Sequence, residues 1–151
     1  MKKDDLLVIL NALVEPVFLV SAKRKITLAN AAAEGLFGEA LVGRDFVHAL
    51  RHPDALKCVN AALDGQAASE AVISLPVPVR ATYRLSSVRL DGADGAEAEA
   101  VVSLNDISHV LEAEQMRSDF VANVSHELRS PLTALSGGIE TLKNAARNDP
   151  E

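Results

Sequence analysis

The sequence predicts an α+β protein, in which an antiparallel sheet of about five strands with short flanking helices precedes one long C-terminal helix. Three observations support this fold class. Short β-rich runs and helix-like segments alternate in the first part of the chain. Apolar and polar residues alternate with a period of two around Tyr83. From Ile107 to about Ala146, only Pro131 and the Gly137-Gly138 pair interrupt helix-forming residues.

The first elements follow from helical and strand spacing. Residues 3–14 carry leucines at helical intervals before Pro16, which predicts an amphipathic helix that ends near the proline. Residues 17–20 and 25–30 are short β-rich runs around a polar loop, which indicates a hairpin. Asn30 can then cap a short helix over residues 31–37.

Small helical pieces and longer strands follow. Between residues 41 and 63 the chain is punctuated by glycine and by Pro53, which we expect to end the helical geometry there. Next comes the alternating strand, whose apolar positions are Val79, Ala81, Tyr83 and Leu85. The loop over residues 91–97 then leads into a closing strand.

Particular residues narrow this order of elements. Asn30 opens a helix that ends Leu36-Phe37-Gly38, Val42-Gly43-Arg44 follows, and Asp106-Ile107-Ser108 closes the last strand. Residues 4–107 therefore resemble the PAS sensor domain. The resemblance implies a five-stranded antiparallel sheet with short helices.

Composition limits the functions open to the chain. Its 151 residues suit one domain plus an extra element, with 48% hydrophobic and 3% aromatic residues. A net charge of −6 argues against nucleic acid as a partner. The single cysteine, Cys58, cannot form an internal disulfide, which favours a reducing compartment. We therefore expect the cytoplasm.

No membrane-spanning segment is expected. The longest apolar stretch, residues 6–20, is broken by Asn11, Glu15 and Pro16 and is shorter than the roughly 20 residues that a spanning helix needs. The N-terminus lacks the features of a signal peptide. Any link to a membrane is expected to run through a segment absent from this chain.

A helical projection divides the long C-terminal segment into two faces. One stripe is apolar and predicts a buried seam; it holds Ala113, Phe120, Val124, Leu128, Leu135, Ile139 and Leu142. The opposite face holds Asp119, His126, Ser130, Thr133, Gly137 and Asn144. A helix of about forty residues needs a partner in water, most simply a second copy in a parallel coiled coil. From periodicity alone, His126 is either a chemical group or a solvated surface histidine.

The motif around this histidine favours the chemical reading. Residues 120–135, FVANVSHELRSPLTAL, closely resemble the phosphoacceptor box of sensor histidine kinases, with Ser130 where the box has threonine. The resemblance implies that His126 accepts the γ-phosphoryl group of ATP and passes it to an aspartate of a response regulator. Glu127 would assist as an acid or base, and Ser130 would orient a water for phosphatase action. For Glu127 and Ser130 the alternative is an ordinary residue on the helix surface.

Four further residues carry expectations. Pro131 removes an amide donor and crowds the preceding turn, so we expect a bend there that transmits signals arriving through residues 107–117. Thr133 and Gly137 continue the His126 face with small side chains, which would admit a regulator helix. Asp106 has two compatible readings, as a cap of the long helix and as the anchor that couples sheet to helix.

No cofactor or metal is expected in this chain. His48 and His52 lie four residues apart, a spacing that could suggest haem or a metal, but Pro53 follows directly and a PAS-like loop explains them better. Cys58 sits in an apolar-patterned helix, so it is expected to be a small core residue.

The sequence thus predicts a PAS domain over residues 4–107 and a signalling and phosphoacceptor helix over residues 108–148, within a sensor histidine kinase of a two-component system. The resemblance extends to the phosphate-regulon sensor kinases. It implies a homodimer, a response regulator as partner, and a separate domain that binds ATP and magnesium. After Leu142 no second bundle helix and no ATP-binding domain follow, so this chain alone is expected to be inactive. The alternative is a non-enzymatic PAS module, for dimerisation or ligand binding, with a coupling helix.

Overall fold

The computed structural model describes residues 2–76 and 79–147. The chain divides into two compact units, with the division after Ser108. The end of the predicted helical segment, residue 148, lies outside the described residues.

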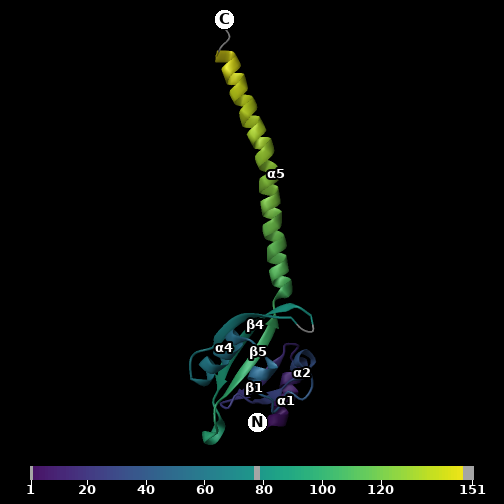
Figure 1. The fold of residues 1–151 in the computed structure, drawn as a ribbon, viewed down its shortest axis with the longest axis vertical. Coiled ribbons are helices and arrows are strands. Elements are labelled where there is room, and N and C mark those ends of the chain that lie inside the picture. Colours follow the sequence, from purple (N-terminus) through teal and green to yellow (C-terminus); the bar gives the residue numbers. More distant parts are fainter. Residues whose placement is uncertain (1, 77–78, 148–151) are drawn as a thin grey trace. The chain divides into compact units, whose positions relative to one another are not determined.

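The first unit contains one antiparallel sheet with the strand order β2-β1-β5-β4-β3 (Figure 1). Its strands are β1 (Val17–Ser21), β2 (Ile26–Ala29), β3 (Ser69–Leu75), β4 (Ala81–Leu90) and β5 (Glu99–Asp106). The last strand in the chain lies at the centre, since β5 pairs with both β1 and β4. With the long helix of the second unit, this sheet confirms the predicted α+β fold.

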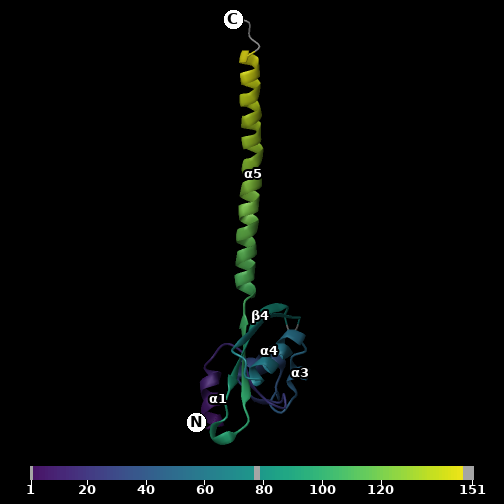
Figure 2. The same ribbon diagram turned by 90° about the vertical axis from the view of Figure 1, so that its left-hand side faces the viewer.

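Helices accompany the sheet and follow it. They are α1 (Lys3–Asn11), α2 (Ala31–Phe37), α3 (Phe46–Ala49), α4 (Pro53–Leu63), the 3₁₀ turn η1 (Ala93–Gly95) and α5 (Ser108–Arg147). Figure 2 shows α1 on one side of the sheet and α3 and α4 on the other.

The two faces of the sheet therefore bury two sets of apolar side chains. The larger set lies on the side of α3 and α4 and includes Phe18, Phe46, Val59 and Leu85. The smaller set lies beneath α1, where Leu10 packs with residues of β1 and β2. Burial of these aliphatic and aromatic groups is the main force that holds α1 and α4 to the sheet.

Local sequence signals account for most element ends. Asn30 caps α2 as predicted, because its side chain accepts a hydrogen bond from the Ala33 amide at 3.0 Å. Gly38 follows the helix with φ +95°, a conformation that favours glycine. In β4, Tyr83 and Leu85 are buried on the inner face, as the alternation there predicts.

Three expectations about element ends were wrong. The helix predicted over residues 3–14 ends at Asn11, where the Leu10 carbonyl accepts both from the Leu13 amide at 3.1 Å, in a tighter turn, and from the Asn30 side chain at 2.9 Å. Pro53 begins α4 instead of ending a helix, since a proline at the first position loses no helical hydrogen bond. Val79 is 76% exposed and precedes β4.

The second unit consists of α5, which is helical from Ser108 to Arg147 and contains Pro131. Its large apolar side chains are all exposed within one chain. Within residues 2–76 and 79–147, no helix is both long and apolar enough to cross a lipid bilayer.

Candidate functional site

His126 lies on α5 with its side chain exposed. No glycine or proline occurs between Ser108 and Ser130, so the backbone leading to the histidine forms regular helix. The imidazole therefore projects from a surface that another protein can approach. A phosphoacceptor requires this accessibility, because a donor and a recipient must reach the same nitrogen in turn.

The other residues of the motif surround His126 on the same helix. Ser130 follows by one helical turn, and Thr133 and Gly137 continue the same face at positions seven and eleven residues after the histidine. All of these residues are exposed, as is Glu127. Glu127 adjoins His126 in sequence but points about 100° away around the helix, so the two side chains do not face each other in this conformation.

A shallow hollow of about 520 Å³ runs along α5 beside this face. It is lined by Ser125, Leu128, Arg129, Leu132, Thr133 and Ser136, all of them residues of α5. Thr133 thus belongs both to the histidine face and to a hollow with two exposed leucines. This surface can accept a side chain from a partner helix.

The helix continues through Pro131 without a break (Figures 1 and 2). Pro131 has no amide hydrogen, so it cannot donate the helical hydrogen bond to the carbonyl of Glu127, one turn earlier. One turn past Gly137, the Thr141 hydroxyl donates to the Gly137 carbonyl at 2.9 Å. The predicted bend at Pro131 and its signalling role stay predictions.

Asp106, the expected coupling residue, lies at the end of β5 in the sheet unit. Its carboxylate accepts a hydrogen bond from the amide of Ser108, the first residue of α5, at 2.9 Å. Ser108 in turn accepts from the Thr82 amide at 3.0 Å, and the Ile107 amide donates to the Thr82 carbonyl at 2.9 Å. These bonds tie Ile107 and Ser108 to β4 within the sheet unit, and the bond at Ser108 is the kind that a capping carboxylate makes.

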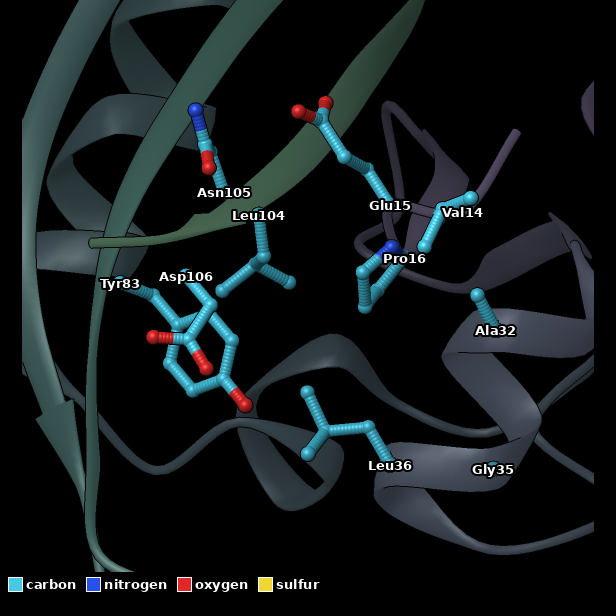
Figure 3. Close-up of a pocket in the computed structure, with 10 residues that line it drawn as sticks. All are labelled: Val14, Glu15, Pro16, Ala32, Gly35, Leu36, Tyr83, Leu104, Asn105 and Asp106. Carbon is cyan, nitrogen blue, oxygen red and sulfur yellow. The ribbon is translucent and has the colours of Figure 1, made fainter. Parts of the chain in front are cut away.

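A pocket of about 620 Å³ opens beside Asp106 in the sheet unit (Figure 3). It is lined by Val14, Glu15, Pro16, Ala32, Gly35, Leu36, Tyr83, Leu104, Asn105 and Asp106. Tyr83 is the register partner of Asp106 across β4 and β5. Burial raises the pKa of Tyr83 above 10.0, and the negative charge of Asp106 raises it further.

Sequence reasoning missed this pocket. Its residues come from the segment after α1, from α2, and from the paired ends of β4 and β5. Only Asp106 carried a recognisable signal. No spacing in the sequence relates Tyr83 to Glu15 or Leu36, so pattern analysis could not have grouped them.

His48 and His52 are not arranged as metal ligands. The chain leaves α3 between them, and the Nδ1 atom of His52 accepts a hydrogen bond from the Asp54 amide at the start of α4. In the described part of the chain, no three or more histidine, cysteine, aspartate or glutamate side chains are placed to hold a metal ion. Cys58 is a buried residue of α4 in the larger core, as expected.

Comparison with known proteins relates both units to signalling families. The family model of the PAS fold matches residues 4–107, and that of the His Kinase A (phospho-acceptor) domain matches residues 116–151. The chain is 33% identical over 135 residues to the phosphate regulon sensor protein PhoR of Pseudomonas aeruginosa. It is 37% identical over 57 residues to the sensor protein SrrB of Staphylococcus aureus.

These relatives are much longer than the chain. The match to PhoR covers 87% of this chain and 28% of PhoR, and the match to SrrB covers 38% of this chain and 10% of SrrB. The chain thus corresponds to a small part of either protein.

Solved structures support the fold of the first unit. The PAS domain of nitrogen regulation protein NR(II) from Vibrio parahaemolyticus has a TM-score of 0.56 at 18% identity, covering 66% of this chain and 95% of that one. The PAS domain of BvgS from Bordetella pertussis has a TM-score of 0.58 at 11% identity, covering 80% and 97%. The chain belongs to the PAS-fold family, and its PAS domain is followed by a His Kinase A (phospho-acceptor) segment, an arrangement in which it is similar to the sensor protein PhoR.

Proposed function

We propose that the chain is the cytoplasmic PAS and phosphoacceptor portion of a sensor histidine kinase, and that His126 carries the phosphoryl group. One observation carries the proposal: His126 is exposed on a continuous helix within the segment that the phosphoacceptor family model matches. The lone buried cysteine and the absence of a spanning helix in the described residues agree with a site of action in the cytoplasm.

The reaction has two steps. In the first, an imidazole nitrogen of His126 attacks the γ-phosphorus of ATP, the bond from that phosphorus to the bridging oxygen breaks, and ADP leaves. In the second, a carboxylate oxygen of the response regulator attacks the same phosphorus, and the nitrogen–phosphorus bond breaks. The ATP, with magnesium, is held by an ATP-binding domain. The chain presents the histidine to both partners.

Neighbouring residues have supporting roles in this proposal. Glu127 assists the first step as an acid or base after its side chain or the helix adjusts. Ser130, one turn from the histidine, orients a water for removal of phosphate from the regulator. Thr133 and Gly137 form the small-residue surface on which a regulator helix docks.

The exposed apolar stripe of α5 supports a homodimer. Phe120 is 68% exposed, Leu128 56% and Leu135 61%, and all three lie on the stripe predicted as a seam. Pairing two copies along this stripe would bury it in a coiled arrangement and leave His126 on the outer surface.

The test supplies the ATP-binding domain of a homologous kinase as a separate protein, together with ATP and magnesium. We expect acid-labile, alkali-stable phosphate on the chain, lost in His126→Gln and absent when the ATP-binding domain is omitted. His109→Gln is the matched control, since His109 is also exposed on α5, with its Nδ1 atom 3.6 Å from a carboxylate oxygen of Glu112. Equal phosphate on wild type and His126→Gln would place the phosphoryl group on another residue and overturn the proposal. No phosphate on wild type would overturn it in favour of a non-enzymatic PAS module.

The same assay separates the supporting roles. Glu127→Gln should slow phosphorylation of His126, by roughly tenfold or more for a lost acid–base group. Ser130→Ala should leave phosphorylation intact and slow dephosphorylation of the regulator. Gly137→Arg should block transfer to the regulator, whereas Gly137→Ala should permit it, because no neighbouring atom lies within 4 Å of an added Cβ. Wild-type rates in these variants would refute the respective roles.

A further inference from the structure

A second feature of the sheet unit lies outside the phosphotransfer chemistry. A hollow of about 460 Å³ is lined by Lys25, Gly43, Arg44, Asp45, His48 and Arg51, here called the basic hollow. It shares no lining residue with the pocket beside Asp106. Three of its six residues carry a positive charge and one a negative charge, in a chain whose net charge is −6. The local charge thus opposes that of the whole molecule.

Backbone hydrogen bonds hold the walls of the basic hollow together. The Ile26 amide donates to the Arg44 carbonyl at 2.9 Å, and the Gly43 amide donates to the Ile26 carbonyl at 2.7 Å. The Phe46 amide donates to the Arg24 carbonyl at 2.8 Å, so the start of α3 is hydrogen-bonded to the turn that leads into β2. The backbone at Lys25 and Arg44 is therefore held in place by these hydrogen bonds. Preorganisation of this kind reduces the entropy lost when a ligand binds.

The basic side chains are available to a ligand. Arg44, His48 and Arg51 are exposed, and within the described residues their side chains have no hydrogen-bond or ion-pair partner. Asp45 is already engaged, since one carboxylate oxygen lies 3.7 Å from the Lys25 ammonium and the other accepts from the Val47 amide at 3.0 Å. The two arginines consequently present uncompensated charge.

An apolar hollow adjoins the basic one. It measures about 510 Å³, and His48 and Arg51 line both. Its other lining residues are Gly35, Leu36, Phe37, Ala49, Leu50, Leu75 and Pro76. A molecule bound across the shared residues would meet the basic side chains on one side and several apolar side chains on the other.

We propose that the two hollows form a binding site for a small organic anion. Its phosphate or carboxylate group lies in the basic hollow, where the planar guanidinium groups of Arg44 and Arg51 suit two-pronged hydrogen bonding to oxyanions. Its apolar part covers the neighbouring hollow along Phe37 and Leu75, which are both partly exposed. Each hollow falls within the size range of small-molecule sites, about 300 to 1,000 Å³. The site is independent of the role of His126.

The test uses the 151-residue chain at constant ionic strength with two probes, inorganic phosphate and phenyl phosphate. Titrations followed by amide NMR should give saturable binding of both, with shifts at Gly43 and His48 and tighter binding of phenyl phosphate. Arg44→Ala and Arg51→Ala should each weaken phenyl phosphate binding, by about 10- to 100-fold for a lost charge-assisted contact. Arg84→Ala is the matched control, because Arg84 is an exposed arginine on β4 outside both hollows.

Three outcomes would overturn the proposal. Binding that does not saturate would mean that phosphate interacts only with the overall charge of the protein. The same would follow if Arg84→Ala weakened binding as much as Arg44→Ala and Arg51→Ala do. Equal affinity for phosphate and phenyl phosphate would exclude an organic ligand that uses the apolar hollow. Arginine-dependent sedimentation with phosphatidylglycerol vesicles, without binding of either soluble probe, would assign the basic face to a lipid surface. Circular dichroism of the variants verifies that each is folded.

Discussion

Asn30 has no exposed surface and joins three segments of the sheet unit. Its side-chain carbonyl accepts from the amides of Val17 at 2.9 Å and Ala33 at 3.0 Å. Its side-chain amide donates to the carbonyls of Leu10 and Glu15, both at 2.9 Å. An asparagine fully bonded in this way fixes the end of α1, the entry to β1 and the start of α2 together.

Replacing Asn30 should therefore cost more than the loss of a helix cap. We expect Asn30→Ala to lower the free energy of unfolding by about 2 to 5 kcal/mol, because buried amides and carbonyls lose their partners. Asn30→Asp should also destabilise, since a carboxylate cannot donate to the two carbonyls. Urea denaturation followed by circular dichroism measures both. The control is Asn105→Ala, at an exposed position, which should change the free energy of unfolding by less than about 0.5 kcal/mol. An equally small loss in Asn30→Ala would show that the hydrogen bonds of the Asn30 side chain do not stabilise the sheet unit.

Tyr83 is the only tyrosine of the chain, which has no tryptophan, so its ionisation can be followed directly by ultraviolet absorbance. Because burial and Asp106 raise its pKa above 10.0, the folded protein should titrate at higher pH than the protein in denaturant. Asp106→Asn should lower the folded midpoint towards 10.0 by removing the charge. A folded midpoint at or below 10.0 would contradict the burial of the phenol.

The direction of the pKa shift also sets the pH dependence of stability. Since the folded state retains the phenolic proton more tightly than the unfolded state, the stabilising contribution is complete below pH 10.0. It is lost as the pH rises from 10.0 through the raised pKa of the folded state. Tyr83→Phe should show a smaller decline in unfolding free energy over that interval.

Helix α5 differs from every element of the sheet unit in what surrounds it. The sheet and its helices enclose two apolar cores, whereas α5 exposes its leucines within a single chain. The stability of this helix must therefore depend on partners that cover the apolar stripe.

Pro131 is where α5 should be easiest to deform. The ring removes one helical hydrogen bond and crowds the carbonyl of Glu127, next to the proposed phosphoacceptor. In a full-length kinase, we expect Pro131→Ala to straighten and stiffen the helix and to alter the ratio of kinase to phosphatase activity. Both activities should be measured on the same preparation. If both match the wild type, the bend has no role in signalling.

The division of the molecule into two units allows association and folding to be separated. Every buried apolar residue of the two cores belongs to the sheet unit. Leu85→Ala should lower the free energy of unfolding by about 2 to 5 kcal/mol through an unfilled cavity, and it should leave self-association intact. Leu128→Asp should have the opposite pattern, with weakened self-association and little change in the stability of the sheet unit.

Analytical ultracentrifugation and urea denaturation of the two variants measure the two quantities separately. Thr133→Asp serves as the control for the added charge, because it lies on the histidine face of α5 rather than the apolar stripe. Unchanged association in Leu128→Asp would place the dimer contact elsewhere.

Local pattern was sufficient for much of this molecule. The alternation around Tyr83, the cap at Asn30 and the uninterrupted helix after Ile107 each depend on residues within a few positions of one another. Backbone propensity and side-chain periodicity act over this range, so the α+β fold could be predicted. The assignment of His126 came from a contiguous motif, and its role is still a prediction.

The remaining features depend on strand register and packing across the chain. The Asn30 network joins residues up to 20 positions apart, and Tyr83 pairs with Asp106 across the sheet beside the pocket. The basic hollow gathers residues from the turn before β2, from α3 and from the loops on either side of α3. Pro53 was misjudged because a proline both ends and begins helices, and the surrounding packing selects between the two. Convergence of distant side chains is a property of the folded chain, and no local spacing encodes it.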